Sequence, residues 1–186
     1  MARHPEYQKK VQEELDEVFG SSNRPVTADD IKQLRYLTAC FKESLRLYPV
    51  APLYARELVS DLKFGEYNVP AGTTVLVANE SLHRDPRYFP DPEEFRPERF
   101  LIKSGDPDAD DTRNGKLHPF AYVPFSAGQR NCIGQKYAQM EDKIVLASVL
   151  RRLWLECDYD EDALAPASEV ILRPTKGIYM RVSYRS

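Results

Sequence analysis

The placement of proline most constrains what this 186-residue chain can fold into. Half of its fourteen prolines lie between Arg84 and Pro124, and each of them lacks a backbone N–H and fixes φ. This stretch can therefore form neither a long helix nor a central strand. A connection of such length inside a compact domain is usually functional or wraps another part of the molecule. Regular secondary structure is expected on either side of it.

Helical periodicity brackets the proline-rich stretch. Apolar residues recur at helical spacing over Pro5–Phe19 and Tyr36–Leu47 before it, and over Gly134–Leu153 after it. Short segments rich in β-branched residues lie between Ala55 and Ala78 and again near the C-terminus, and they are typical of small sheets. The pattern predicts a mainly α fold with small β-sheets, of the α+β class.

Charge and hydropathy exclude several classes of partner. The 26 Lys and Arg residues against 29 Asp and Glu residues leave a net charge of -3 with no basic stripe, so no nucleic acid is expected to bind. No run approaches the ~18 apolar residues of a membrane span, and no signal sequence is evident, so no anchor is expected in this chain. Cys40, Cys132 and Cys157 are too far apart to favour a disulfide scaffold or a paired-cysteine zinc site. The acidic run Asp106–Asp111 indicates a solvated loop rather than a calcium site, because it lacks a regular ligand spacing.

One cysteine stands in a setting that suits metal ligation. Cys132 lies in the segment Phe125–Gly134 (FSAGQRNCIG), immediately before a long predicted helix. Its sulfur is therefore expected near backbone N–H groups and the positive end of the helix macrodipole, which favour a thiolate. Gly128 permits a tight turn, Gly134 permits close approach of a flat ligand, and Arg130 supplies a fixed cation. Such a loop predicts a metal held by one thiolate.

The spacing of Phe125, Gly128, Arg130, Cys132 and Gly134 resembles the haem-binding loop of cytochrome P450 monooxygenases. Two further segments match that family in the same order along the chain, residues 43–46 (ESLR) and 97–100 (PERF). The resemblance runs from residue 3 to the end of the chain. The sequence of the cysteine loop is most similar to the fourth P450 family, whose members typically hydroxylate fatty acids or related lipids.

The resemblance implies haem b as the cofactor and Cys132 as the proximal ligand of its iron. The other residues that it implies at the haem are Phe125, Gly128, Ile133, Gly134 and Ala138, together with Arg130, Arg56 and His83 facing the propionates. A hydrogen-bonded surface histidine is an equal interpretation of His83.

The resemblance also implies a structural triad. Glu43 and Arg46 lie three residues apart on one helical face, and Arg99 comes from a distant loop, so one carboxylate could bridge two guanidiniums. On spacing alone, a pair of solvated helix charges is the more common arrangement. Substrate contacts are implied at five residues, for which simple closure of the core is an equal alternative: Ala51, Pro52, Leu53, Val170 and Ile171.

For activity, the resemblance implies an oxidoreductase, a haem-thiolate monooxygenase that inserts one oxygen atom of O2 into a C–H bond of a lipid-like or other hydrophobic substrate. The electrons would come from NADPH through a reductase, and the location would be the endoplasmic reticulum membrane, with membrane contact by family analogy only. Residues 1–186 are expected to be the C-terminal, haem-proximal part of one P450 domain, without the upstream oxygen-activating helix and N-terminal region. No catalytic residue beyond the haem ligand is then expected, and the chain alone is expected to be inactive. The alternative is a non-catalytic truncated remnant that binds haem weakly or not at all.

Overall fold

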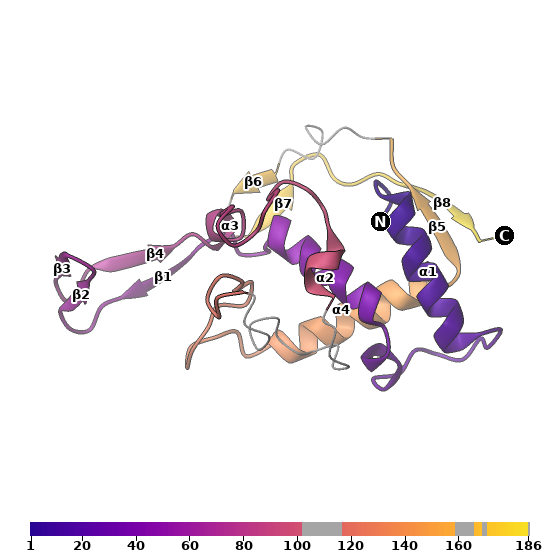
Figure 1. Ribbon diagram of the computed structural model, residues 1–186, viewed down its shortest axis with the longest axis horizontal. Coiled ribbons are helices and arrows are strands. Elements are labelled where there is room, and N and C mark those ends of the chain that lie inside the picture. The colour runs from indigo at the N-terminus through magenta and orange to yellow at the C-terminus, as the bar shows by residue number, and fades with distance from the viewer. Residues whose placement is uncertain (102–116, 159–165, 169–170, 186) are drawn as a thin grey trace.

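Three long helices form the core of the computed structural model, which describes residues 1–101, 117–158, 166–168 and 171–185. They are α1 (Pro5–Phe19), α2 (Arg35–Leu47) and α4 (Gln135–Leu150). Each contacts the other two (Figure 1). The buried residues that they and the short helix η1 (Asp30–Lys32) share are Val11, Leu15, Phe19, Ile31, Leu34, Leu37, Cys40, Ala147 and Leu150. None of the described helices is long and apolar enough to cross a membrane.

These helices confirm the predicted periodicity. The bounds of α1 are those predicted, because Gly20 follows it with a φ of 54°, a value that favours glycine and takes the chain out of the helix. α2 begins one residue earlier than predicted, and α4 ends at Leu150, where the chain turns into a strand. The mixture of helices and small sheets agrees with the predicted α+β class.

The described part of the proline-rich stretch packs against α2. It contains the short helix η2 (Pro97–Phe100), which contacts α2 extensively. Phe89 and Phe100 are buried with Ala39 of α2 and Ala121, forming a second small core. The proline-rich stretch therefore wraps a helix, which is one of the two roles expected for a connection of this length. The acidic run 106–111 lies outside the described residues.

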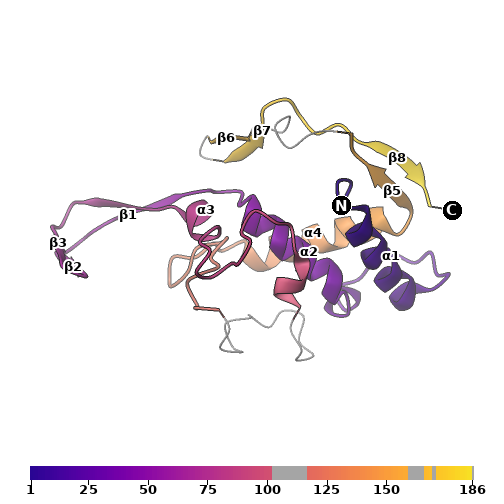
Figure 2. The same cartoon turned by 45° about the horizontal axis from the view of Figure 1, so that its top comes forward.

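The strands among the described residues form four separate two-stranded antiparallel sheets. Their bounds are β1 (Tyr54–Glu57) with β4 (Thr74–Val77), β2 (Leu62–Phe64) with β3 (Tyr67–Val69), β5 (Leu153–Glu156) with β8 (Arg181–Tyr184), and β6 (Pro166–Ser168) with β7 (Leu172–Pro174). β1 and β4 form an arm that extends away from the helices and carries β2 and β3 at its tip (Figures 1 and 2). The short helix α3 (Asn79–Leu82) follows at the base of this arm.

Two buried glutamines join the C-terminal sheet to α1. The side chain of Gln8 donates a hydrogen bond to the carbonyl of Leu155 and accepts one from its N–H, both at 2.9 Å. The Gln12 side chain donates to the carbonyls of Leu150 and Leu153 at 3.1 and 3.0 Å. Because these amides complete the edge of β5, the first helix and the last sheet lie side by side (Figure 2).

Candidate functional site

The cysteine loop closes on itself and leads directly into α4. Its tight turn places Ser126 and Gly128 at φ values of 63° and 81°. The N–H of Cys132 donates to the carbonyl of Phe125 at 3.0 Å, which closes the loop. Gly134 precedes the first residue of α4, and a Cβ added there would lie 3.8 Å from the Cys132 sulfur. The exposed cysteine thus sits at the N-terminal end of a long helix, in the setting that the sequence predicted.

Cys132 lines a cavity of about 430 Å³. This volume is within the range of roughly 300–1,000 Å³ that is usual for small-molecule sites. The other lining residues come from α2, the segment after it, β1, the cysteine loop and α4: Leu45, Val50, Ala51, Tyr54, Pro124, Phe125, Ser126, Arg130, Asn131 and Ala138. A mostly apolar wall with one thiol can hold a flat apolar ligand that carries a metal.

Several residues expected at the haem do lie around this cavity. Phe125, Arg130 and Ala138 line it together with Cys132, and Gly128 and Gly134 shape the loop. Ile133 is fully exposed and is not among the lining residues.

Arg56 is brought to the same loop from β1. Its Nη2 donates to the carbonyl of Arg130 at 3.0 Å and to Ser126 Oγ at 3.4 Å. The guanidinium of Arg56 therefore lies at the cysteine loop beside Arg130, which lines the cavity, whereas Arg56 is not among the lining residues.

His83 lies elsewhere. Its side chain is fully buried, and its Nε2 accepts a hydrogen bond from the N–H of Val123 at 2.9 Å. Burial, with the nearby guanidiniums of Arg46 and Arg84, lowers the pKa of His83 to about 4. It is not among the residues that line the Cys132 cavity. Both interpretations, a propionate contact and a surface histidine, are therefore corrected, because packing of distant segments buries the ring.

Glu43, Arg46 and Arg99 form a buried cluster. Arg46 donates from Nε to Glu43 Oε2 and from Nη2 to Oε1, both at 2.8 Å, and the two side chains are fully buried. Arg99 Nε reaches Glu43 Oε1 at 3.3 Å, and the N–H of Arg96 donates to the same oxygen at 2.9 Å. The remaining donors of Arg46 reach three backbone carbonyls, at 3.0, 2.7 and 3.0 Å: those of His83, Pro92 and Glu94. Full burial excludes a pair of solvated helix charges.

The residues expected to contact substrate are only partly brought together. Ala51 lines the cavity, whereas Pro52 is buried and Leu53 is half exposed, and neither is among the lining residues. The N–H of Leu172 donates to the carbonyl of Val50 at 2.8 Å, which places the segment of Ile171 beside this wall. Val170 lies outside the described residues.

Sequence reasoning assigned no role to two of the lining residues, Leu45 and Asn131. The position of Leu45 could have been predicted from helix geometry. It lies between Glu43 and Arg46 in the sequence, so on a helix it points away from the face that those two residues share.

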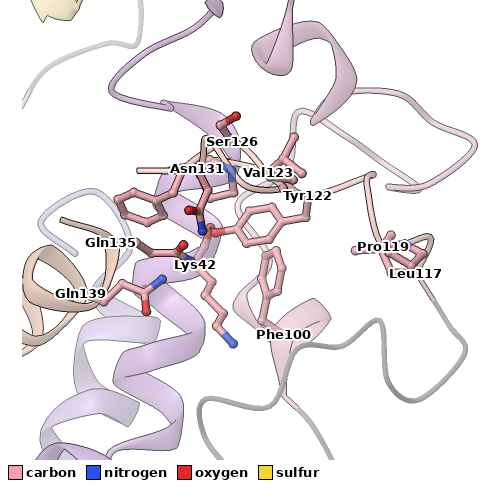
Figure 3. Close-up of a pocket in the computed structure, with 14 residues that line it drawn as sticks. Lys42, Phe100, Leu117, Pro119, Tyr122, Val123, Ser126, Asn131, Gln135 and Gln139 are labelled. Carbon is pink, nitrogen blue, oxygen red and sulfur yellow. Dashed lines mark hydrogen bonds between the residues drawn. The ribbon is translucent and has the colours of Figure 1, made fainter. Parts of the chain in front are cut away.

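A second cavity, of about 350 Å³, lies against the same loop (Figure 3). Gln135 and Gln139 of α4, Lys42 of α2 and Tyr122 surround it. Cys132 is not among its lining residues, so the first cavity is the candidate site.

Known proteins similar to this chain share one family. The family model described as Cytochrome P450 matches residues 1–182. The chain is 51% identical over 185 residues to "Cytochrome P450 4V2" of Mus musculus, covering 100% of the chain and 34% of that protein. It is 48% identical over 186 residues to "Cytochrome P450 4V2" of Homo sapiens, with the same coverage of 100% and 34%. It is 45% identical over 183 residues to "Cytochrome P450 4c3" of Drosophila melanogaster, covering 98% of the chain and 32% of that protein. The chain thus spans about a third of the length of the curated relatives it matches.

Proposed function

This chain belongs to the cytochrome P450 family, and we propose on that basis that residues 1–186 form the C-terminal, haem-proximal part of a haem-thiolate monooxygenase. The observation that carries the proposal is the position of Cys132, an exposed thiol that lines a cavity of about 430 Å³ directly before α4. The proposed reaction inserts one atom of O2 into a C–H bond, and the other atom leaves as water with two protons and two electrons. NADPH would supply these electrons through a reductase.

The residues around Cys132 suit haem b. Phe125 and Ala138 would offer apolar contacts to the porphyrin, and Gly134 lies beside the sulfur, which a Cβ at that position would contact at 3.8 Å. Arg130 lines the cavity and Arg56 is bonded to its carbonyl, so we infer that these two guanidiniums would pair with the propionates. When bound, the haem supplies an iron that activates O2, and a thiolate ligand favours O–O cleavage.

The chain's own residues would hold the thiolate in place. The bond from Cys132 N–H to the Phe125 carbonyl fixes the loop, and Gly134 and α4 follow the cysteine almost at once, so its position along the chain is fixed on both sides. Phe125 and Pro124 form part of the wall beside the cysteine, so they would keep water from that side of the ligand.

We further propose a lipid-like substrate, in keeping with a fatty acid hydroxylase. Leu45, Val50 and Ala51 form an apolar wall that needs no polar partner from the substrate. The segment of Ile171 would add a further apolar contact, since Leu172 holds it beside Val50. Association with the endoplasmic reticulum membrane is part of the same proposal, by analogy with the fourth family.

The spectrum of the reduced, carbon-monoxide-bound chain tests haem ligation. We expect a thiolate-type Soret band after addition of haem to the parent chain and to the control Cys157→Ala, because Cys157 does not line the cavity. Cys132→Ala should lose this band while its urea unfolding midpoint stays near that of the parent, because the Cys132 side chain is exposed and contributes little to the core. The same band in Cys132→Ala would refute the ligand assignment. A folded parent chain without any band would favour the non-catalytic alternative.

A further inference from the structure

A series of hydrogen bonds connects the buried ion cluster to the cysteine loop through His83. Arg46 Nη1 donates to the carbonyl of His83 at 3.0 Å, and His83 Nε2 accepts from the N–H of Val123 at 2.9 Å. The carbonyl of Val123 accepts from Ser126 N–H at 3.0 Å, and Cys132 N–H donates to the neighbouring Phe125 carbonyl. His83 is the side chain in this series that joins the segment after α3 to Val123, two residues before the cysteine loop begins at Phe125.

The hydrogen bond to Val123 determines the tautomer of His83. An N–H donates to Nε2, so the proton of the neutral ring must be on Nδ1. The charged groups that face the ring are the guanidiniums of Arg46 and Arg84, and its aromatic neighbour is Tyr122, with ring centroids 5.2 Å apart. Two cations and full burial both disfavour imidazolium.

Asn79 provides the matching acceptor. It lies one helical turn before His83, its side chain is 1% exposed, and its Nδ2 donates to the carbonyl of Ala51 in the cavity wall at 2.9 Å. Asn79 Oδ1 and His83 Nδ1 are the two buried side-chain polar atoms without a hydrogen-bond partner among the described residues. One is an acceptor and the other must be a donor, and residues four apart on a helix are neighbours. A direct contact after a small side-chain rotation, or one buried water, would satisfy both.

We propose that His83 is a positioning residue for the Cys132 loop, held in its Nδ1-protonated form by Asn79. Asn79 would at the same time hold the carbonyl of Ala51. The segment 79–83 would then set the spacing between two walls of the same cavity, the one that contains Ala51 and the one formed by the cysteine loop. An effect of this spacing on haem binding rests on the proposed function. The hydrogen bonds themselves do not depend on haem, because they join residues of this chain.

Three variants of the 186-residue chain test this role. His83→Leu removes the acceptor and leaves the Val123 N–H buried without a partner, whereas His83→Gln keeps an acceptor that can reach the place of Nε2. Gln12→Leu is the control for loss of a buried side-chain-to-backbone hydrogen bond outside the cysteine loop, because Gln12 donates to the carbonyls of Leu150 and Leu153.

Amide hydrogen exchange of the haem-free proteins is the first measurement. In His83→Leu we expect exchange at Val123, Ser126 and Cys132 to accelerate about tenfold or more, as expected for one stranded buried donor. His83→Gln should keep the parent rates, and Gln12→Leu should accelerate exchange in β5 instead. Equal acceleration at these three amides in His83→Leu and Gln12→Leu, or no rescue by His83→Gln, would overturn the positioning role.

The carbon-monoxide spectrum with haem is the second measurement. If His83 positions the ligand loop, His83→Leu should show a smaller fraction of the thiolate-type band than either His83→Gln or Gln12→Leu. Equal fractions in all three would refute an effect on ligation. If no variant and no parent shows the band, the proposed function fails, while the exchange rates still decide the role of His83.

Discussion

Replacement of Arg46 by alanine tests how much the buried cluster stabilises this fold. The Arg46 guanidinium bonds both oxygens of Glu43 and the carbonyls of His83, Pro92 and Glu94. These contacts join α2 to the segment around α3 and to the proline-rich stretch. Arg46→Ala therefore removes five hydrogen bonds and leaves Glu43, which is fully buried, with Arg99 as its remaining cation.

The expected cost follows from what remains after the change. A buried ion pair that loses one partner typically costs about 3–5 kcal/mol, because the other charge stays desolvated. Arg99 and the Arg96 N–H still serve Glu43, so we expect a value near the lower end, about 3 kcal/mol, with unpaired carbonyls adding to it. Domains are stable by roughly 5–15 kcal/mol, so this single change should remove a large part of the total. Arg46→Lys should fall between the parent and alanine, because an ammonium has three donors where five are used.

Urea unfolding, followed by circular dichroism, measures this cost. Lys32→Ala is the matched control, since Lys32 and Asp29 have the same three-residue spacing and a 2.8 Å contact, but their side chains are 66% and 88% exposed. That control should cost less than about 1 kcal/mol. If Arg46→Ala lowers the free energy of unfolding no more than Lys32→Ala does, the argument from burial is wrong. Arg46→Ala should also prevent haem uptake wherever it unfolds the chain, and a stable, haem-loaded Arg46→Ala protein would contradict the reasoning.

Two further predictions concern pH and the C-terminal sheet. The pKa of His83 is lowered from 6.5 to about 4 in the fold, so between these values the unfolded chain binds more protons, and stability present above about pH 6.5 should decline toward pH 4. This shift in pKa corresponds to a loss of at most roughly 3 kcal/mol in the free energy of unfolding. As the pH falls, the urea midpoint of the parent should therefore drop more steeply than that of His83→Gln. Parallel plots of midpoint against pH for the two proteins would contradict the prediction. Gln8→Leu should cost about 1–3 kcal/mol, because it strands both backbone groups of Leu155. Amide exchange at Leu155 should then accelerate, and unchanged protection there would show that the glutamine does not support β5.

The helices could be predicted because their signals are local. Proline at the start and Gly20 after the end bound α1, and these residues act through their own backbone conformations. The strand segments between Tyr54 and Val77 were predicted in the same way, from short strand-like runs separated by turn residues, whereas β6 (Pro166–Ser168) was not predicted and contains no β-branched residue. Which strands pair was not predictable: β5 pairs with β8 across the C-terminal segment, and Gln8 from the first helix completes its edge.

In the candidate site too, the features that depend on neighbouring residues could be predicted, and those that depend on distant residues could not. The Cys132 loop could be found from residue types, because a tight glycine turn, a cation and a following helix all lie within ten residues. The role of His83 could not, because its burial depends on Val123 and Arg46, which are 40 and 37 residues away in the sequence. The charged residues next to His83 in the sequence predict an exposed side chain, and only the packing of a distant segment buries it.

The sequence by itself determined the helices and the family, and it predicted Cys132 as a metal-ligating cysteine in the loop before a helix. Those properties depend on backbone conformation and residue chemistry over short distances. The tertiary structure alone decided that Glu43 and Arg46 are buried rather than solvated, that Arg56 reaches the cysteine loop, and that His83 supports this loop instead of lining the cavity. The physical reason is that burial and hydrogen-bond partners are set by segments distant in sequence, and these determine which charged or polar groups lose their contact with water.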